Sequence, residues 1–380
     1  MERPIKVRLH VLSPIHIGCD DVYEPTCFVI DELKKKLIEF DPLEFVKNLK
    51  NDERDKLNEI ALSGNLLEIF KTIKRFYKFT IKGREVEVTD YLVNHYKKRI
   101  LEAVTFDKNA VVNQFTILKT AYNPHTNMPY IPGSSVKGAI RTAFLNKQAK
   151  LKNITNFKGK SDELETLLLE RSEGKMKIPT DPFRMVKVSD FKHAGDVKSK
   201  IIYAINRKKQ KTDRKTLAEK KGVYQIFEVI QPGAIFEGII NINTPLDLSD
   251  IKVTITADDL FTSLNKFYAP LLENEIKTLK DMGIFVPLIN EINEKFNKQI
   301  NKTAFIIRIG RHSGAEAITI EGNRRIKIMQ GKNKEGQMQY EYKSSSTTIW
   351  LASESPKQES NAGLLPFGWA ILEKVQENNV

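Results

Sequence analysis

Residues 131–144 combine the chemical groups with which a protein can hold a phosphate. A turn is predicted at Pro132-Gly133, and Ser134 or Ser135 is placed to be the N-cap of a following helix. The first turn of a helix presents unpaired backbone N–H groups and a partial positive charge. Two hydroxyl side chains at that position add further hydrogen-bond donors, so this segment predicts an anion-binding helix start.

Two cations follow on the same helix. Lys137 and Arg141 are four residues apart and therefore share one face. Lys137 precedes Gly138, which is the wrong order for a Walker A nucleotide loop. The pattern therefore favours the phosphate of a polymer backbone over that of a free nucleotide.

A second candidate site is the loop Gly310-Arg-His-Ser-Gly314, which follows a predicted strand at 303–309. Arg311 can form a forked pair with a phosphate or stack on a base, and His312 can donate a hydrogen bond to phosphate. Glycines on both sides give these two side chains little reason to be there for packing. We therefore predict that Arg311 and His312 contact the ligand.

The overall charge also favours a polyanionic partner. The 380 residues include 61 Lys+Arg and 48 Asp+Glu, a formal net charge of +13, and the isoelectric point is near 9.4. Residues 147–222 hold 21 basic and 10 acidic side chains. This stretch therefore carries most of the excess, and its most basic run, 207–221, is predicted to be a solvated loop.

Other classes of protein are disfavoured. No apolar run is long enough to cross a bilayer, and the first residues lack the apolar core of a signal peptide. Cys19 and Cys27, the only cysteines, cannot build a disulfide framework, and their spacing fits no common zinc pattern even with His10 and His16 nearby. We expect a cytoplasmic protein without a metal or other cofactor, in which Asp20-Asp21 is a solvated acidic pair.

Strands and helices alternate along the chain. Asp41 beside Pro42 predicts a helix start, and Gln231-Pro-Gly233 predicts a hairpin turn. Helices are predicted at 42–77, 88–104, from 134, and at 161–173, 257–282 and 286–300. Strands are predicted at 4–13, 28–30, 37–40, 115–120, 181–190, 224–230, 234–242, 303–309, 347–352 and 369–375.

These elements predict an α+β fold made of two ferredoxin-like (RRM-like) units with helical insertions and a β-hairpin formed by 224–230 and 234–242. The predicted organisation is a first unit at 1–147, a basic Lys-rich insertion at 148–222 and a second unit at 223–380.

In six segments the chain resembles the RAMP superfamily of CRISPR-associated RNA-binding proteins. The segments occur in order along nearly the whole chain: 12–18, 131–144, 181–190, 227–238, 308–314 and 363–372. In length and in its Gly-Arg-His-Ser-Gly segment it is most similar to the fifth Csm subunit family of type III-A effector complexes.

The resemblance implies a non-catalytic subunit that binds the 3′ region of the guide crRNA, caps the filament of backbone subunits and supports maturation of the crRNA 3′ end. Its implied partners are the crRNA, the other Csm subunits, above all the backbone RAMP subunit, and a trimming nuclease, with no membrane. It also implies a glycine-rich loop near the guide. Here that loop holds only Gly363 and Gly368, so these two are RNA-binding candidates or an ordinary turn. Phe367 and Trp369 could stack on bases, but core packing is favoured for them.

Two alternatives stay open. In the first, the chain is a metal-independent endoribonuclease that processes guide precursors, with His16, His125 or His312 as its acid–base group. A hydrogen-bonded structural role is favoured for His16. In the second, the chain is a scaffold whose basic run at 207–221 recruits the trimming nuclease.

Overall fold

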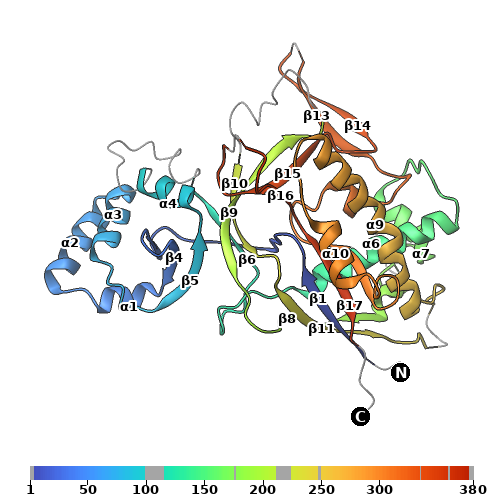
Figure 1. Cartoon of the computed structure of the whole chain (residues 1–380), viewed down its shortest axis with the longest axis horizontal. Helices are drawn as coiled ribbons and strands as arrows, with labels where there is room; N and C mark the ends of the chain where they lie inside the picture. Colours follow the sequence, from blue (N-terminus) through green and yellow to red (C-terminus); the bar gives the residue numbers. More distant parts are fainter. Residues whose placement is uncertain are drawn as a thin grey trace.

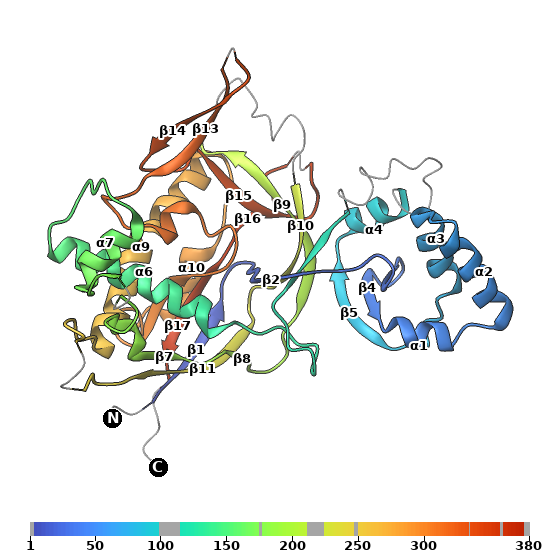
Figure 2. The same cartoon turned by 180° about the vertical axis from the view of Figure 1, so that it is seen from behind.

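The structure is a computed structural model, and it contains two β-sheets (Figures 1 and 2). It describes residues 4–98, 115–174, 177–210, 224–246, 250–333, 335–357 and 360–375.

Sheet A is antiparallel and joins the two ends of the chain. Its strand order is β12-β17-β1-β11-β7, and β8 also pairs with β11. In β1, side chains alternate, so that Val7, Leu9 and Val11 are buried. The strands are β1 (Ile5–Val11), β7 (Val186–Val188), β8 (Lys192–His193), β11 (Ile235–Ile242), β12 (Ala304–Arg308) and β17 (Trp369–Lys374).

Helices α6 (Gly133–Leu151) and α9 (Ala257–Asp281) contact each other and sheet A through a shared hydrophobic core (Figure 1). Thr256 and Asp259 form a capping box at the start of α9, with the Asp259 N–H 3.1 Å from Thr256 Oγ1. The shorter helices nearby are α7 (Ser161–Leu169) and α10 (Leu288–Phe296). Of the helices that the structure describes, none has the length and apolarity needed to span a membrane.

Sheet B has nine strands, and its main order is β2-β6-β10-β9-β5-β4-β3. β9 is central to it, because β9 pairs with β10 on one side and with both β5 and β15 on the other. The strands are β2 (Gly18–Val22), β3 (Phe28–Asp31), β4 (Lys36–Phe40), β5 (Gly83–Val88), β6 (Ile117–Thr120), β9 (Ser199–Lys208), β10 (Tyr224–Ile230), β15 (Thr348–Ser353) and β16 (Leu365–Pro366).

Four helices and the outer strands of sheet B form a lobe, seen on the left of Figure 1. The helices are α1 (Pro42–Lys47), α2 (Asn51–Leu62), α3 (Leu66–Phe76) and α4 (Asp90–Tyr96). Asp41 is the N-cap of α1 and accepts the Leu43 N–H at 2.7 Å, as its place before Pro42 predicts. At the top of Figure 1, β13 (Ile326–Lys332) and β14 (Met338–Lys343) form a projecting hairpin.

The α+β prediction is confirmed. In sheet A the order β17-β1-β11-β7, with α6 after β1 and α9 after β11, is that of a ferredoxin-like unit, and β12 is added at its edge. The predicted hairpin of β10 and β11 is wrong, because β10 belongs to sheet B and β11 to sheet A. The turn at 231–233 therefore carries the chain from one sheet to the other.

The two sheets do not coincide with the predicted boundaries at 147 and 222. β1 comes from the first predicted unit and pairs with β11 and β17 of the last. The stretch 148–222 supplies β9, the central strand of sheet B. Two predictions lie partly outside the described residues: the helix at 88–104 beyond residue 98, and the basic run beyond residue 210.

Candidate nucleic-acid interface

A groove of about 460 Å³ brings three distant segments of the chain together. One follows β1, the second is the start of α6, and the third is the loop after β12. Its lining residues include Gly18, Ser134, Ser135, Gly138, Thr142, Arg308, Gly310, Arg311 and Ser313. The two strongest predicted anion sites, the helix start and the Gly-Arg-His-Ser-Gly loop, are therefore walls of one groove.

The loop after β12 is held against the segment after β1 by backbone contact. The Arg311 N–H donates to the carbonyl oxygen of His16 at 2.8 Å. Gly310 has φ +85°, and a Cβ there would lie 2.6 Å from the same oxygen. Glycine is therefore required at 310 for this close approach. The contact fixes where the Arg311 side chain leaves the backbone.

At the start of α6, the N-cap prediction is wrong by two or three residues, because the N-cap is Pro132. The helix begins at Gly133, whose N–H donates to Asp190 Oδ1 at 2.8 Å, and Pro132 precedes it without a side-chain cap. Ser134 is exposed and Ser135 is half-buried. Neither hydroxyl makes a hydrogen bond to another described residue, so both are available to a ligand in the groove.

Lys137 lies one turn further along α6 and is half-buried. Its ammonium forms no ion pair with the described part of the chain. Burial lowers the pKa of Lys137, and the neighbouring Lys187 lowers it further by repulsion. An anion bound between these two cations would relieve that repulsion.

Arg141 is placed differently from the prediction. Its guanidinium donates to Asp181 through Nη1 (3.0 Å) and Nη2 (2.7 Å), and Nη2 also lies 2.7 Å from Glu165 Oε2. The group lies over the ring of Phe183, with 4.9 Å from Cζ to the centroid. Arg141 thus ties α6 to α7 and to the segment before β7, and its charge is compensated internally.

Arg311 is exposed, and its guanidinium makes no ion pair with any described residue. Its Cζ lies 5.4 Å from the ring centroid of Phe227, which supports the side chain without neutralising it. Arg311 is therefore an uncompensated cation at the groove.

Arg308 was not among the predicted site residues. It is 5% exposed and lines the groove; Nη1 pairs with Glu275 at 2.7 Å and Nε donates to the Phe367 carbonyl at 2.9 Å. Its buried Nη2 has no hydrogen-bond partner among the residues that the structure describes. The only sequence signal was its place at the end of a strand, next to the glycine loop.

His16 and His312 are embedded in an aromatic cluster. His16 is fully buried, stacks on Phe227 at 4.4 Å, and its Nδ1 donates to the Glu228 carbonyl at 2.8 Å. Burial lowers the pKa of His16 to about 4 and that of His312 to about 3, and Arg311 contributes to both. His312 stacks on Trp350 at 4.4 Å, so it does not point freely toward a ligand as predicted.

His16 is poorly placed as an acid–base group. A general base must reach the proton that it removes, and no part of His16 is accessible. Its Nε2, which lacks the proton when Nδ1 carries it, is buried and has no hydrogen-bond partner in the described part of the chain. The favoured structural role of His16 agrees with these contacts. His125 lies exposed in the loop after β6 and does not line the groove.

Gly363 and Gly368 differ in role. Gly368 is buried with φ +89°, and a Cβ there would lie 2.4 Å from the Ile309 carbonyl oxygen, so it lets β17 pack against the loop that carries Arg311. Gly363 is exposed and has open space around it. Phe367 and Trp369 are fully buried, which agrees with the favoured core role.

The described residues hold no cluster of three or more His, Cys, Asp or Glu side chains that could bind a metal ion. Cys19 is an exposed free thiol and Cys27 a half-buried one.

Comparisons with known proteins agree with the resemblance to the RAMP superfamily. The RAMP superfamily model matches residues 8–285. One curated relative is the CRISPR system Cms protein Csm5 of Methanocaldococcus jannaschii, which is 25% identical over 410 aligned residues, covering 98% of this chain and 89% of the relative.

Two solved structures have a similar fold. The first is a chain from a cryo-EM structure of a Csm–crRNA–target RNA ternary complex of a type III-A CRISPR-Cas system, with a TM-score of 0.59, 19% identity, and coverage of 98% of this chain and 100% of that chain. The second is the crystal structure of Csm5 from T. onnurineus, with a TM-score of 0.51, 18% identity and coverage of 82% and 92% respectively.

Proposed function

The chain belongs to the RAMP superfamily, and from this premise we propose that it is a non-catalytic RNA-binding subunit of a type III-A Csm complex. In this proposal it binds the 3′ region of the guide crRNA, caps the filament of backbone subunits and supports maturation of the crRNA 3′ end. Its partners are the crRNA, the backbone RAMP subunit and a trimming nuclease. The similarity to Csm5 along nearly the whole chain supports this assignment.

The observation that carries the proposal is the convergence of free donors in one groove. Ser134 and Ser135 offer their hydroxyls at the first turn of α6, and Arg311 offers an uncompensated guanidinium across the groove. Phosphates and 2′-hydroxyls accept hydrogen bonds from such groups. Contacts of this kind hold an RNA backbone without reading its sequence, which suits a subunit that must accept many guides.

A non-catalytic role is supported by the state of the histidines. His16 is buried and His312 is stacked between aromatic rings, so neither is placed to transfer a proton to an RNA in the groove. Of the three histidines of the endoribonuclease alternative, only His125 is exposed, and it does not line the groove; His16 would act only after a rearrangement that exposes it.

The test is incubation of the purified full-length chain with labelled mature and precursor crRNAs over a range of salt concentrations, with and without EDTA. The expected result is intact RNA in a complex whose affinity falls steeply with salt, because each neutralised phosphate releases counterions. Failure to bind either RNA would overturn the proposal. Metal-independent cleavage at a fixed position that a single change, His16→Ala, His125→Ala or His312→Ala, abolishes would instead make the chain an endoribonuclease.

A further inference from the structure

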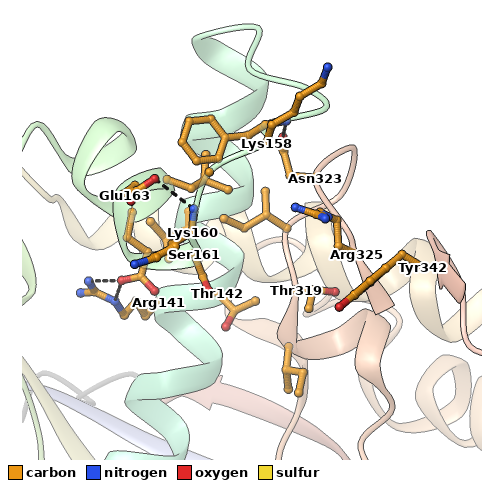
Figure 3. A pocket seen from close by; sticks show the side chains of 17 residues that line it. Arg141, Thr142, Lys158, Lys160, Ser161, Glu163, Thr319, Asn323, Arg325 and Tyr342 are labelled. Atoms are coloured by element: carbon orange, nitrogen blue, oxygen red, sulfur yellow. Dashed lines mark hydrogen bonds and ion pairs between the residues drawn. The ribbon is translucent and has the colours of Figure 1, made fainter. Parts of the chain in front are cut away.

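A second cavity, of about 820 Å³, lies beside the groove. We call it the hairpin pocket, because its walls come from the loop before α7, the start of α7, and the base of the β13–β14 hairpin (Figure 3). Thr142 and Ile318 line both this pocket and the groove. A linear polymer bound in the groove can therefore continue into the hairpin pocket.

The two walls are tied together across a long sequence separation. Asn323 accepts the Phe157 N–H on Oδ1 at 2.9 Å and donates from Nδ2 to the Ile154 carbonyl at 2.8 Å. The Asn156 N–H donates to the Gly322 carbonyl at 2.9 Å. The pocket is thus a built feature in which the hairpin base and the loop before α7 keep a fixed spacing.

The free charge in the hairpin pocket is positive. Lys158, Lys160 and Arg325 are exposed, and their side chains make no ion pair with any residue that the structure describes. Of the two carboxylates of the lining, Glu165 is paired with Arg141, and Glu163 accepts the Lys160 backbone N–H at 3.0 Å and keeps its charge, so three free cations stand against one free anion. The three uncompensated cations therefore favour an anionic ligand.

The pocket also has an exposed aromatic ring. Tyr342 is 56% exposed, and the Arg325 Cζ lies 5.2 Å from its ring centroid. Figure 3 shows Arg325 and Tyr342 entering from the hairpin side, opposite Ser161 and Thr142. A ring this exposed contributes little to packing. Cations beside an open aromatic ring are the arrangement with which proteins bind single-stranded nucleic acid, because any base can stack on the ring.

We infer that the hairpin pocket binds unpaired nucleotides of the same RNA strand that occupies the groove. A base stacks on Tyr342, and Lys158, Lys160 and Arg325 hold the flanking phosphates. The inference rests on the proposed function and deepens it, since it assigns the path of the strand beyond the groove. Stacking and phosphate contacts carry no base identity, so the pocket accepts any sequence.

The test uses the full-length chain and single-stranded RNAs with the 3′ sequence of a guide, in which 2-aminopurine replaces one base at a time. In the wild-type chain, binding should quench the fluorescence of one or two successive positions that stack in the pocket. Tyr342→Leu should remove this quenching and weaken binding roughly 5- to 100-fold. Arg325→Ala should weaken binding and reduce the salt dependence by about one phosphate.

Tyr340→Leu is the matched control, because Tyr340 lies two residues away on the same strand and does not line the pocket. It should leave quenching and affinity unchanged. An effect equal to that of Tyr342→Leu would assign the loss to the hairpin as a whole and overturn the inference. If Tyr342→Leu has no effect while Arg311→Ala weakens binding, the pocket is excluded and the proposed function stands. A wild-type chain that binds no RNA overturns both.

Discussion

The guanidinium of Arg141 and the carboxylate of Asp181 form a two-pronged pair, with Nη1–Oδ1 at 3.0 Å and Nη2–Oδ2 at 2.7 Å. Asp181 is also the N-cap of the short 3-10 helix Pro182–Arg184 and accepts the Phe183 N–H at 2.8 Å. The pair therefore fixes the segment that leads into β7. Arg141 binds protein where the sequence predicted that it would bind RNA.

Replacing Arg141 should therefore affect stability more than RNA binding. We expect Arg141→Ala to lower the free energy of unfolding by about 2–4 kcal/mol, because Asp181 and Glu165 lose their partner in a half-buried site. Arg141→Lys should lower the free energy of unfolding less, because lysine keeps the positive charge but cannot form the two-pronged pair. Denaturant unfolding measures both. If a variant keeps its stability but binds RNA poorly, Arg141 contacts RNA and the prediction is wrong.

Removing uncompensated cations should have the opposite effect, both at Arg311, which lines the groove, and at Lys137, which precedes the groove-lining Gly138 on α6. Arg311→Ala and Lys137→Ala should each weaken RNA binding about 5- to 10-fold and lower the slope of log affinity against log salt by about 1. Stability should change little. Lys82→Ala, an exposed site before β5 that is remote from the groove, removes the same charge as a control. Equal effects from all three variants would point to net charge and against a defined site.

The two late glycines give a matched test of packing. Gly368→Ala should cost about 2–4 kcal/mol of stability, because its Cβ would lie 2.4 Å from the Ile309 carbonyl oxygen and φ is +89°. Gly363→Ala, at φ +76° in open space, should cost only about 1 kcal/mol. Thermal unfolding compares them. If the folded Gly363→Ala chain loses RNA affinity, the exposed glycine belongs to the interface.

Acidification should destabilise the protein through His16 and His312. Their pKa values in the folded chain are about 4 and about 3, below the value of about 6.5 expected after unfolding. The unfolded chain therefore binds protons first, and stability falls as pH drops from about 6.5 toward 4. His16→Asn should reduce this slope by up to about 1.4 kcal/mol per pH unit. An unchanged slope between pH 6.5 and 4.5 would show that His16 is not held neutral.

Local features of the fold could be predicted from the sequence, because neighbouring residues determine them. The helix from Pro42 follows from a capping residue, and the antiparallel pair β3–β4 follows from two short apolar runs close together in the sequence. Neighbouring residues could not show that β10 and β11 belong to different sheets. Gln231-Pro-Gly233 specifies a turn, but β11 gains more by pairing with β1, more than 200 residues earlier.

In the candidate site, too, local features could be predicted from the sequence and tertiary contacts could not. Ser134, Ser135 and Arg311 could be selected by residue type and by flanking glycines, and the structure places them in one groove. The compensation of Arg141 could not be foreseen, because Asp181 and Glu165 reach it only after α7 and the segment before β7 pack on α6. The Nη2 of Arg308, which finds no partner within the described ranges, likewise depends on the tertiary fold.

The position of β1 between β11 and β17 has a consequence for biosynthesis. At about 5–20 residues per second, tens of seconds pass between translation of β1 and translation of β17. During that time β1 lacks one neighbour, and the loop bearing Arg311 lacks Gly368 behind it. A prematurely terminated product would thus lack the finished groove, and under the proposed function only a fully translated subunit would compete for guide RNA.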